Sequence, residues 1–189
     1  MLPEIVATDV RYRGWSTFLI ATIRLPDGST IARGIEDHGN AVAVLPYDPV
    51  RRVAILVQQL RAPALYAAKQ PHFLEAVAGR IDDGEDAESS ARRETREEAG
   101  LDLRALERVA RAWAMPGVST EQMDLFLGEY TEADRVGAGG GIEDENIEVL
   151  EIPLTKLAAM ADSGALNDMK TLLLLQTLRL RRPELFTPA

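Results

Sequence analysis

Three glutamates within five residues are the side chains in this sequence best suited to chemistry. Glu94 and Glu98 are four residues apart and Glu97 lies between them, so on a helix all three project from the same side. Like charges at this spacing destabilise a helix by roughly 0.2–0.5 kcal/mol per pair. Carboxylate oxygens suit Mg²⁺ and Mn²⁺, which bind through a few carboxylates together with substrate phosphates and water. One interpretation of the spacing is therefore a site for a divalent cation.

A simpler interpretation of the same segment is a helix face that is only solvated. Arg92, Arg93 and Arg96 are interleaved with the glutamates, and such mixed charge is typical of a helix that faces water. The three glutamates by themselves favour this simpler interpretation. A longer pattern is needed to choose the cation site over it.

That longer pattern covers residues 79–101, which read GRIDDGEDAESSARRETREEAGL. The segment resembles the Nudix box: a glycine, five residues, Glu, seven residues, Arg-Glu, an apolar position, any residue, Glu-Glu, any residue, glycine and an aliphatic residue. The matching residues are Gly79, Glu85, Arg93, Glu94, Glu97, Glu98, Gly100 and Leu101. Thr95 stands where the box prefers an aliphatic residue. Because threonine is β-branched like valine, this departure concerns packing and not the chemistry.

The resemblance to the Nudix hydrolases implies an α/β fold, an α/β/α sandwich around a mixed β-sheet, in which the box forms a loop, a helix and a loop. It implies Mg²⁺ as cofactor, with Mn²⁺ as a substitute. It assigns catalysis to Arg93, Glu94, Glu97, Glu98 and Glu145, metal binding to Glu94, Glu98, Glu145 and the Ala78 carbonyl, and the box geometry to Gly79, Glu85 and Gly100. Arg93 would orient the glutamates by ion pairing, and Glu145 would join the metal site from a loop when substrate binds.

Residues outside the box narrow the resemblance. Pro116, in the segment Met-Pro-Gly-Val-Ser-Thr-Glu, is placed as in the ADP-ribose and nucleotide-sugar branch. The segments AGGGIEDENIEVLEIPL and GALNDMKTLLLLQ resemble the bacterial GDP-mannose pyrophosphatases, a likeness that spans most of residues 40–182. The first hypothesis is hydrolysis of GDP-mannose to GMP and mannose 1-phosphate, and the alternative is an ADP-ribose pyrophosphatase. A non-catalytic nucleotide-sugar sensor is a third hypothesis, which damaged box glutamates would favour, but these are intact.

The same resemblance implies a set of residues that contact the substrate. They are Trp15, Arg33, Arg61, Glu121, Asp144 and Lys170. In two places the sequence departs from the subgroup and each departure removes a cation. Gln58 stands where an Arg is usual, and Ala32 stands where a Lys is usual. Because of these departures, the sequence does not indicate which nucleotide base the enzyme prefers.

Composition excludes several kinds of partner. A formal charge of -9 argues against a broad nucleic-acid surface, and an anionic chain with an anionic substrate needs a metal or a few placed cations. The absence of cysteine excludes disulfides and thiolate metal sites. No apolar run approaches the roughly 20 residues of a membrane span, and the N-terminus lacks the pattern of a signal peptide. We therefore predict a cytoplasmic protein that binds neither membrane nor nucleic acid.

Turn and cap residues predict the elements that position these side chains. We expect a hairpin turn at Leu25 to Ser29, a helix that begins at the cap residue Asp86 and ends at Gly100, and a last helix stopped by Pro183. The expected strands are 15–24, 30–36, 41–45, 53–60, 73–78, 108–114, 124–130 and 147–152, and the expected helices are 86–99, 155–162 and 169–181. Trp113 is expected to be packed, and His38 and His72 are expected to have no catalytic part.

We expect two parts in the chain: an N-terminal β subdomain at 1–40 and a Nudix domain at 41–189. The resemblance implies a homodimer in which the N-terminal strands reach over the partner's site, and a sheet packed within one chain is the alternative. The glycine-rich segment 136–141 precedes the acidic segment 142–146. We expect the glycines to let the acidic loop swing toward the metals, the alternative being a merely mobile surface loop.

Overall fold

The computed structural model describes residues 1–142 and 146–187 and divides into two compact units. The first unit contains residues 1–41 and 111–123, and the second contains residues 42–110 and 124–189. The first unit therefore holds a second segment besides the N-terminal one. A functional boundary after residue 40 stays a prediction.

The first unit is built on an antiparallel sheet of three strands in the order β1-β2-β3, with bounds Glu4–Arg13, Thr17–Arg24 and Thr30–Asp37. The predicted hairpin turn is confirmed: the Leu25 N–H donates to the Ser29 carbonyl at 2.8 Å, and Gly28 has a φ of 84°. Strand β1 was not predicted. All ten of its residues are exposed, so it shows no alternation of buried and exposed positions that a sequence pattern could reveal.

The larger sheet has seven strands, with the path β10-β5-β4-β9-β8, β6 beside β5 and β7 beside β4. The bounds are β4 Ala41–Asp48, β5 Val53–Gln59, β6 Phe73–Glu75, β7 Val77–Arg80, β8 Glu107–Trp113, β9 Gln122–Glu129 and β10 Glu148–Pro153. All eight residues of β4 are buried. A central strand that is covered on both faces has a continuous run of apolar residues in its sequence. This run explains why β4 and β5 were predicted correctly.

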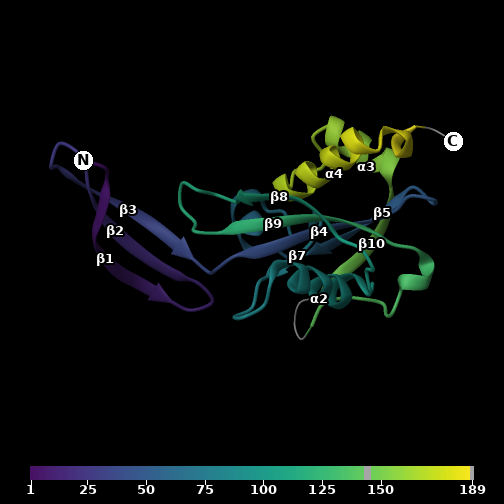
Figure 1. Ribbon diagram of the computed structural model, residues 1–189, viewed down its shortest axis with the longest axis horizontal. Helices are drawn as coiled ribbons and strands as arrows, with labels where there is room; N and C mark the ends of the chain where they lie inside the picture. Colours follow the sequence, from purple (N-terminus) through teal and green to yellow (C-terminus); the bar gives the residue numbers. More distant parts are fainter. Residues whose placement is uncertain (143–145, 188–189) are drawn as a thin grey trace. The chain divides into compact units, whose positions relative to one another are not determined.

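The helices are α1 Ala62–Ala68, α2 Ala87–Ala99, α3 Leu154–Asp162 and α4 Met169–Arg181, with short 3-10 turns at η1 Glu132–Asp134 and η2 Pro183–Phe186. Figure 1 shows α2 on one side of the larger sheet and α3 and α4 on the other, which confirms the predicted α/β class with helices on both faces. Helix α1 was missed because it is short and buries no residue. The packing predicted for Trp113 was wrong for the single chain, since this residue is 54% exposed.

The hydrophobic core beneath α2 fixes that helix against the sheet. Val44 and Ile55 from the sheet pack in one cluster with Ala91, Ala99 and Leu101. Thr95, the one departure from the box, is fully buried, and its hydroxyl donates to the Ala91 carbonyl at 2.7 Å. This bond satisfies the hydroxyl, so the threonine packs where an aliphatic residue is usual. In the described part of the chain, no helix is both long enough and apolar enough to cross a membrane.

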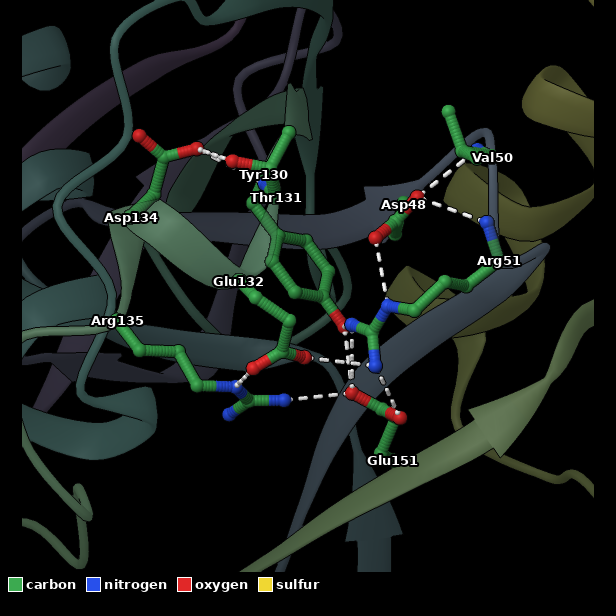
Figure 2. Close-up of polar contacts among 9 residues, drawn as sticks. All are labelled: Asp48, Val50, Arg51, Tyr130, Thr131, Glu132, Asp134, Arg135 and Glu151. Atoms are coloured by element: carbon green, nitrogen blue, oxygen red, sulfur yellow. Dashed lines mark hydrogen bonds and ion pairs between the residues drawn. The ribbon is translucent and has the colours of Figure 1, made fainter.

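A network of charged side chains closes one end of the larger sheet around Tyr130 (Figure 2). Arg51 holds Glu151 through two nitrogens, each at 2.9 Å, and Asp48 through Nε at 2.7 Å. The Tyr130 hydroxyl donates to Glu151 at 2.9 Å, and the guanidinium carbons of Arg51 and Arg135 lie 5.6 and 5.7 Å from the ring centroid. We call Asp48, Arg51, Tyr130, Glu132, Arg135 and Glu151 the Tyr130 cluster. It ties the β4–β5 turn to η1 and β10.

Candidate active site

Helix α2 carries the three glutamates and has the predicted ends. The Asp86 carboxylate accepts from the backbone N–H groups of Glu88 and Ser89, each at 2.9 Å, and so caps the first turn. At the other end Gly100 has a φ of 66°, in the left-handed region, and its N–H donates to the Arg96 carbonyl at 3.1 Å. A Cβ at Gly100 would also lie 2.2 Å from the Gly137 carbonyl oxygen. The helix therefore cannot end in this way with another residue at position 100.

Gly79 leaves room for the side chain of Glu94. A Cβ built on Gly79 would lie 1.9 Å from the carboxyl carbon of Glu94, closer than any real contact. The glycine at the start of the box thus lets the carboxylate lie directly against strand β7. The Glu94 side chain is 13% exposed, so it is held at the sheet and does not extend into water.

Arg93 connects the acidic residues of the box. Its Nη1 donates to Glu94 at 2.7 Å and to Glu97 at 3.2 Å, and its Nη2 donates to Glu85 at 3.1 Å. Nη2 also donates to the Arg80 carbonyl at 3.0 Å, which ties the helix to the end of β7. One guanidinium therefore orients two glutamates of α2 and fixes the loop residue Glu85 to the same point.

Glu98 is the most buried of the three glutamates, with 3% of its surface exposed. Burial, together with the nearby charges of Glu94 and Glu75, raises the pKa of Glu98 to about 8, although the Ala78 N–H, which donates to Glu98 at 3.0 Å, and the charge of Arg61 oppose the shift. The charge of this buried carboxyl is therefore only partly compensated. A hard divalent cation would supply the missing positive charge.

The oxygen atoms available at this site suit such a cation, but they are too few to complete its coordination. Glu94 and Glu98 provide carboxylate oxygens, and Ala78, whose carbonyl was the third predicted ligand, lies beside Glu98. Within residues 1–142 and 146–187, no three acidic, histidine or cysteine side chains form a group that could hold a metal by itself. The remaining ligands would be substrate oxygens and water, as is usual for Mg²⁺. The predicted ligand Glu145 and the predicted substrate residue Asp144 lie outside the described residues.

Next to the α2 carboxylates lies a second set of ionic contacts around Glu75, at the end of β6. Glu75 accepts from Arg61 Nε at 2.6 Å and from Lys170 Nζ, and Lys170 also pairs with Asp168 at 3.2 Å. The sequence analysis named Arg61 and Lys170 but missed Glu75. Its one sequence signal is an acidic residue inside the otherwise apolar run Phe73 to Val77. We call these four residues the Glu75 cluster.

The glycine-rich segment 136–141 is docked on the C-terminal end of α2. The Gly140 N–H donates to the Glu98 carbonyl at 2.9 Å and the Gly141 N–H donates to the Glu97 carbonyl at 3.1 Å. A Cβ at Gly139, which has a φ of 71°, would lie 2.3 Å from the Glu98 carbonyl oxygen. The prediction that these glycines let the acidic loop swing stays a prediction, and the contacts of 139–141 add a second part for them. They permit close approach and bind the last carbonyls of the helix.

The other predicted substrate residues belong to the first unit. The rings of Trp15 and His38 stack with centroids 4.8 Å apart, and His38 Nε2 lies 3.2 Å from Glu121. His38 is therefore hydrogen-bonded, and its lack of a catalytic part stays a prediction. Arg33 Nη1 donates to the Ala32 carbonyl at 2.8 Å. Trp15 and Glu121 are thus brought together through His38 within this unit.

Comparison with known proteins identifies the family of this chain. The model of the NUDIX domain family matches residues 37–173. A GDP-mannose pyrophosphatase of Cronobacter sakazakii is 40% identical over 159 residues, which cover 82% of each chain. A GDP-mannose pyrophosphatase of Citrobacter koseri is 37% identical over 147 residues, which cover 77% of this chain and 76% of the relative.

A likeness among solved structures supports the fold. The crystal structure of an ADP compounds hydrolase matches with a TM-score of 0.78, covering 97% of this chain and 96% of that chain at 19% sequence identity. The box helix, the carboxylates that it places against β7 and the match over most of the chain lead to one assignment. This chain belongs to the Nudix family and is a Nudix hydrolase.

Proposed function

We propose that this enzyme hydrolyses the diphosphate bond of a nucleoside diphosphate sugar with the help of Mg²⁺, and that its substrate is GDP-mannose, which gives GMP and mannose 1-phosphate. The observation that carries the proposal is the buried carboxyl of Glu98, which lies on α2 close enough to Glu94 for the two charges to repel each other. The relatives named GDP-mannose pyrophosphatase, which align over about four fifths of the chain, support the choice of sugar nucleotide.

The metal would be held by Glu94, Glu98 and the Ala78 carbonyl, and Mn²⁺ would substitute for Mg²⁺ because the donors are all oxygens. When bound, the metal would neutralise the charge of the phosphates and lower the pKa of a water molecule that it binds. Arg93 keeps Glu94 and Glu97 in place for this purpose, at 2.7 and 3.2 Å. Because diphosphate cleavage develops charge on oxygen without much covalent chemistry, holding these groups still is the main task of the protein.

The diphosphate would be bound by Arg61 and Lys170, which lie beside the α2 carboxylates. The charges of Arg61 and Glu75 both act on Glu98, which supports a position of Arg61 close to the proposed metal ligands, and Lys170 binds the same Glu75. Trp15, Arg33 and Glu121 of the first unit, and Asp144 and Glu145 outside the described residues, keep their predicted roles in substrate and metal binding as part of this proposal.

A panel of nucleotide sugars with identified products tests the proposal. With Mg²⁺, GDP-mannose should be cleaved with a higher kcat/KM than ADP-ribose, and ³¹P NMR should detect GMP and mannose 1-phosphate. Equal or reversed preference would exclude our choice of sugar and favour an ADP-ribose pyrophosphatase. Binding without any cleavage would favour the sensor hypothesis.

One structural detail bears on the choice of base. Gln58, which stands where the subgroup has an Arg, donates from Nε2 to Glu148 at 3.1 Å. The Gln58→Arg variant restores the missing cation. If that cation contributes to base recognition, the variant should change KM more than kcat for GDP-mannose, whereas the KM of ADP-ribose should change less.

We further propose a homodimer that covers strand β1. The strand is exposed along its whole length and includes Ile5, Val10 and Tyr12, which are 55%, 39% and 60% exposed. An exposed apolar strand favours association. Light scattering after gel filtration should give twice the 20.7 kDa mass of the chain, and the Ile5→Lys/Tyr12→Lys variant should give a monomer. A monomeric wild type would exclude this proposal.

The cytoplasmic location stays a prediction.

A further inference from the structure

Glu75 is a buried carboxylate whose two oxygens bind two different cations. It is 2% exposed, Oε1 accepts from Arg61 Nε at 2.6 Å, and Oε2 accepts from Lys170 Nζ. Arg61 precedes Glu75 by 14 residues and Lys170 follows it by 95, so one side chain joins two distant segments of the chain. Burying a carboxylate is costly unless it is paired on both oxygens, as it is here.

Each cation retains donors that Glu75 does not use. Arg61 is held by Nε, and its two terminal nitrogens make no hydrogen bond to the described residues; its side chain is 42% exposed. Lys170 has three N–H groups and gives one to Glu75 and one to Asp168. Because a guanidinium held by its Nε edge presents both terminal nitrogens together, Arg61 is oriented for two-point binding of a phosphate.

Charge balance indicates what Glu75 contributes. The cluster holds two cations, Arg61 and Lys170, and two carboxylates, Glu75 and Asp168, so it has no net positive charge with which to attract an anion. Without Glu75, Arg61 and Lys170 would attract a phosphate more strongly. Glu75 therefore contributes by orienting the two cations and does not contribute by adding attraction for an anion.

The backbone next to Glu75 connects this cluster to the metal site. The Ala76 N–H donates to the Thr171 hydroxyl at 2.6 Å, which fixes β6 to the start of α4, the helix that carries Lys170. Two residues further along, the Ala78 N–H donates to Glu98. One short segment thus sets the position of Lys170 and of a proposed metal ligand relative to each other.

We infer that Glu75 is a positioning residue, which holds Arg61 and Lys170 so that their remaining N–H groups bind the diphosphate of the substrate. This inference rests on the proposed function, because it concerns the group that these cations bind. Glu75 itself does not touch the substrate. Glu75 acts through the two cations, so experiments can distinguish its role from that of a residue that only stabilises the fold.

The first test is the Glu75→Gln variant, in which shape is kept and charge is lost. The amide offers one acceptor and one donor group, so either Arg61 or Lys170 meets a donor where it had an acceptor. Since misplacement of a binding group by about 1 Å can cost 10²-fold, kcat/KM should fall by about 10²-fold. The matched control is Asp48→Asn, which removes another buried, Arg-paired carboxylate of the same sheet and should leave kcat/KM within about twofold of wild type. Glu75→Asp keeps the charge and should restore part of the loss.

A double-mutant cycle with Lys170→Met separates positioning from a general structural effect. If Glu75 acts through Lys170, the Glu75→Gln change should cost at least about tenfold less in the Lys170→Met background than in wild type. Effects that multiply, or a Glu75→Gln enzyme with wild-type kcat/KM, would overturn the inference while leaving the proposed function intact.

A measurement without turnover completes the test. In ¹⁵N NMR the Arg61 Nε–H, assigned with Arg61→Lys, should exchange slowly in wild type and in Asp48→Asn, and rapidly in Glu75→Ala, which removes both acceptor oxygens. An unchanged Arg61 signal in Glu75→Ala would overturn the inference whatever the activity. A wild-type enzyme that cleaves no nucleotide sugar would instead overturn the proposed function, and the inference would fall with it.

Discussion

The Tyr130 cluster and the α2 carboxylates use the same residue types with opposite results. In the Tyr130 cluster, burial would raise the pKa of Asp48 and of Glu151, but hydrogen bonds from Arg51, joined by the Val50 N–H at Asp48 and the Tyr130 hydroxyl at Glu151, outweigh it and both pKa values lie below their ordinary values. On α2, burial and the neighbouring carboxylates together raise the pKa of Glu98 to about 8. Paired charges thus stabilise one end of the sheet, whereas the buried Glu98 on α2 has no ion pair among the described residues and is the carboxyl whose charge the proposed metal would balance.

The largest effect should follow the loss of the most buried carboxylate. Glu98→Gln removes a ligand of the proposed metal, whose contribution to the transition state is several kcal/mol, so kcat should fall by about 10³-fold or more. Without metal, the variant should be as stable as wild type or slightly more stable at neutral pH, because the buried Glu98 must bind a proton to avoid a charge beside Glu94 and Gln does not. Steady-state kinetics and thermal unfolding in a chelator measure the two quantities. Near-normal turnover would refute the ligand assignment.

The loop against α2 offers a second test of the site. Gly139→Ala places a Cβ about 2.3 Å from the Glu98 carbonyl, so the loop must leave the helix end. A displacement of this kind should lower kcat/KM by about 10²-fold. Gly137→Ala is the matched control, since its Cβ would meet nothing within 4 Å, and it should keep wild-type activity. Equal effects of the two substitutions would mean that the docking of the loop does not matter for catalysis.

The sequence predicted the box helix better than its surroundings, and the reasons are physical. Asp86 and Gly100 act through contacts within a few residues of themselves, so their types and positions were sufficient to predict the ends of α2. Glu75 contacts partners 14 and 95 residues away, which no local pattern contains. Glycine serves mobility and close approach equally well, so the composition of segment 136–141 could not show which of the two applies.

The pH dependence of metal-free stability should distinguish the α2 carboxylates from the Tyr130 cluster. The pKa of Glu98 rises from an ordinary 4.5 to about 8 in the folded state, so between these values the folded protein binds more protons than the unfolded one. Stability in a chelator should therefore fall as pH rises through this window, by about 1.4 kcal/mol per pH unit. Glu98→Gln should lack this slope when unfolding by urea is measured from pH 5 to 8. A wild type and a variant with parallel pH profiles would show that Glu98 is not protonated in the folded state.

The smallest effect is expected from Arg51→Met in the Tyr130 cluster. The change leaves Asp48 buried without its cation, and because Arg51 is 34% exposed the free energy of unfolding should fall by only about 1–3 kcal/mol, while kcat/KM stays at the wild-type value. The carboxyl pKa values here are lowered, so the contribution is present above the ordinary values of 3.8 and 4.5 and is lost as pH falls through the folded-state values. The stability difference between wild type and Arg51→Met, measured by urea unfolding, should thus shrink under acid. A loss of turnover at unchanged stability would show that the Tyr130 cluster acts on catalysis, and the contrast with α2 would then fail.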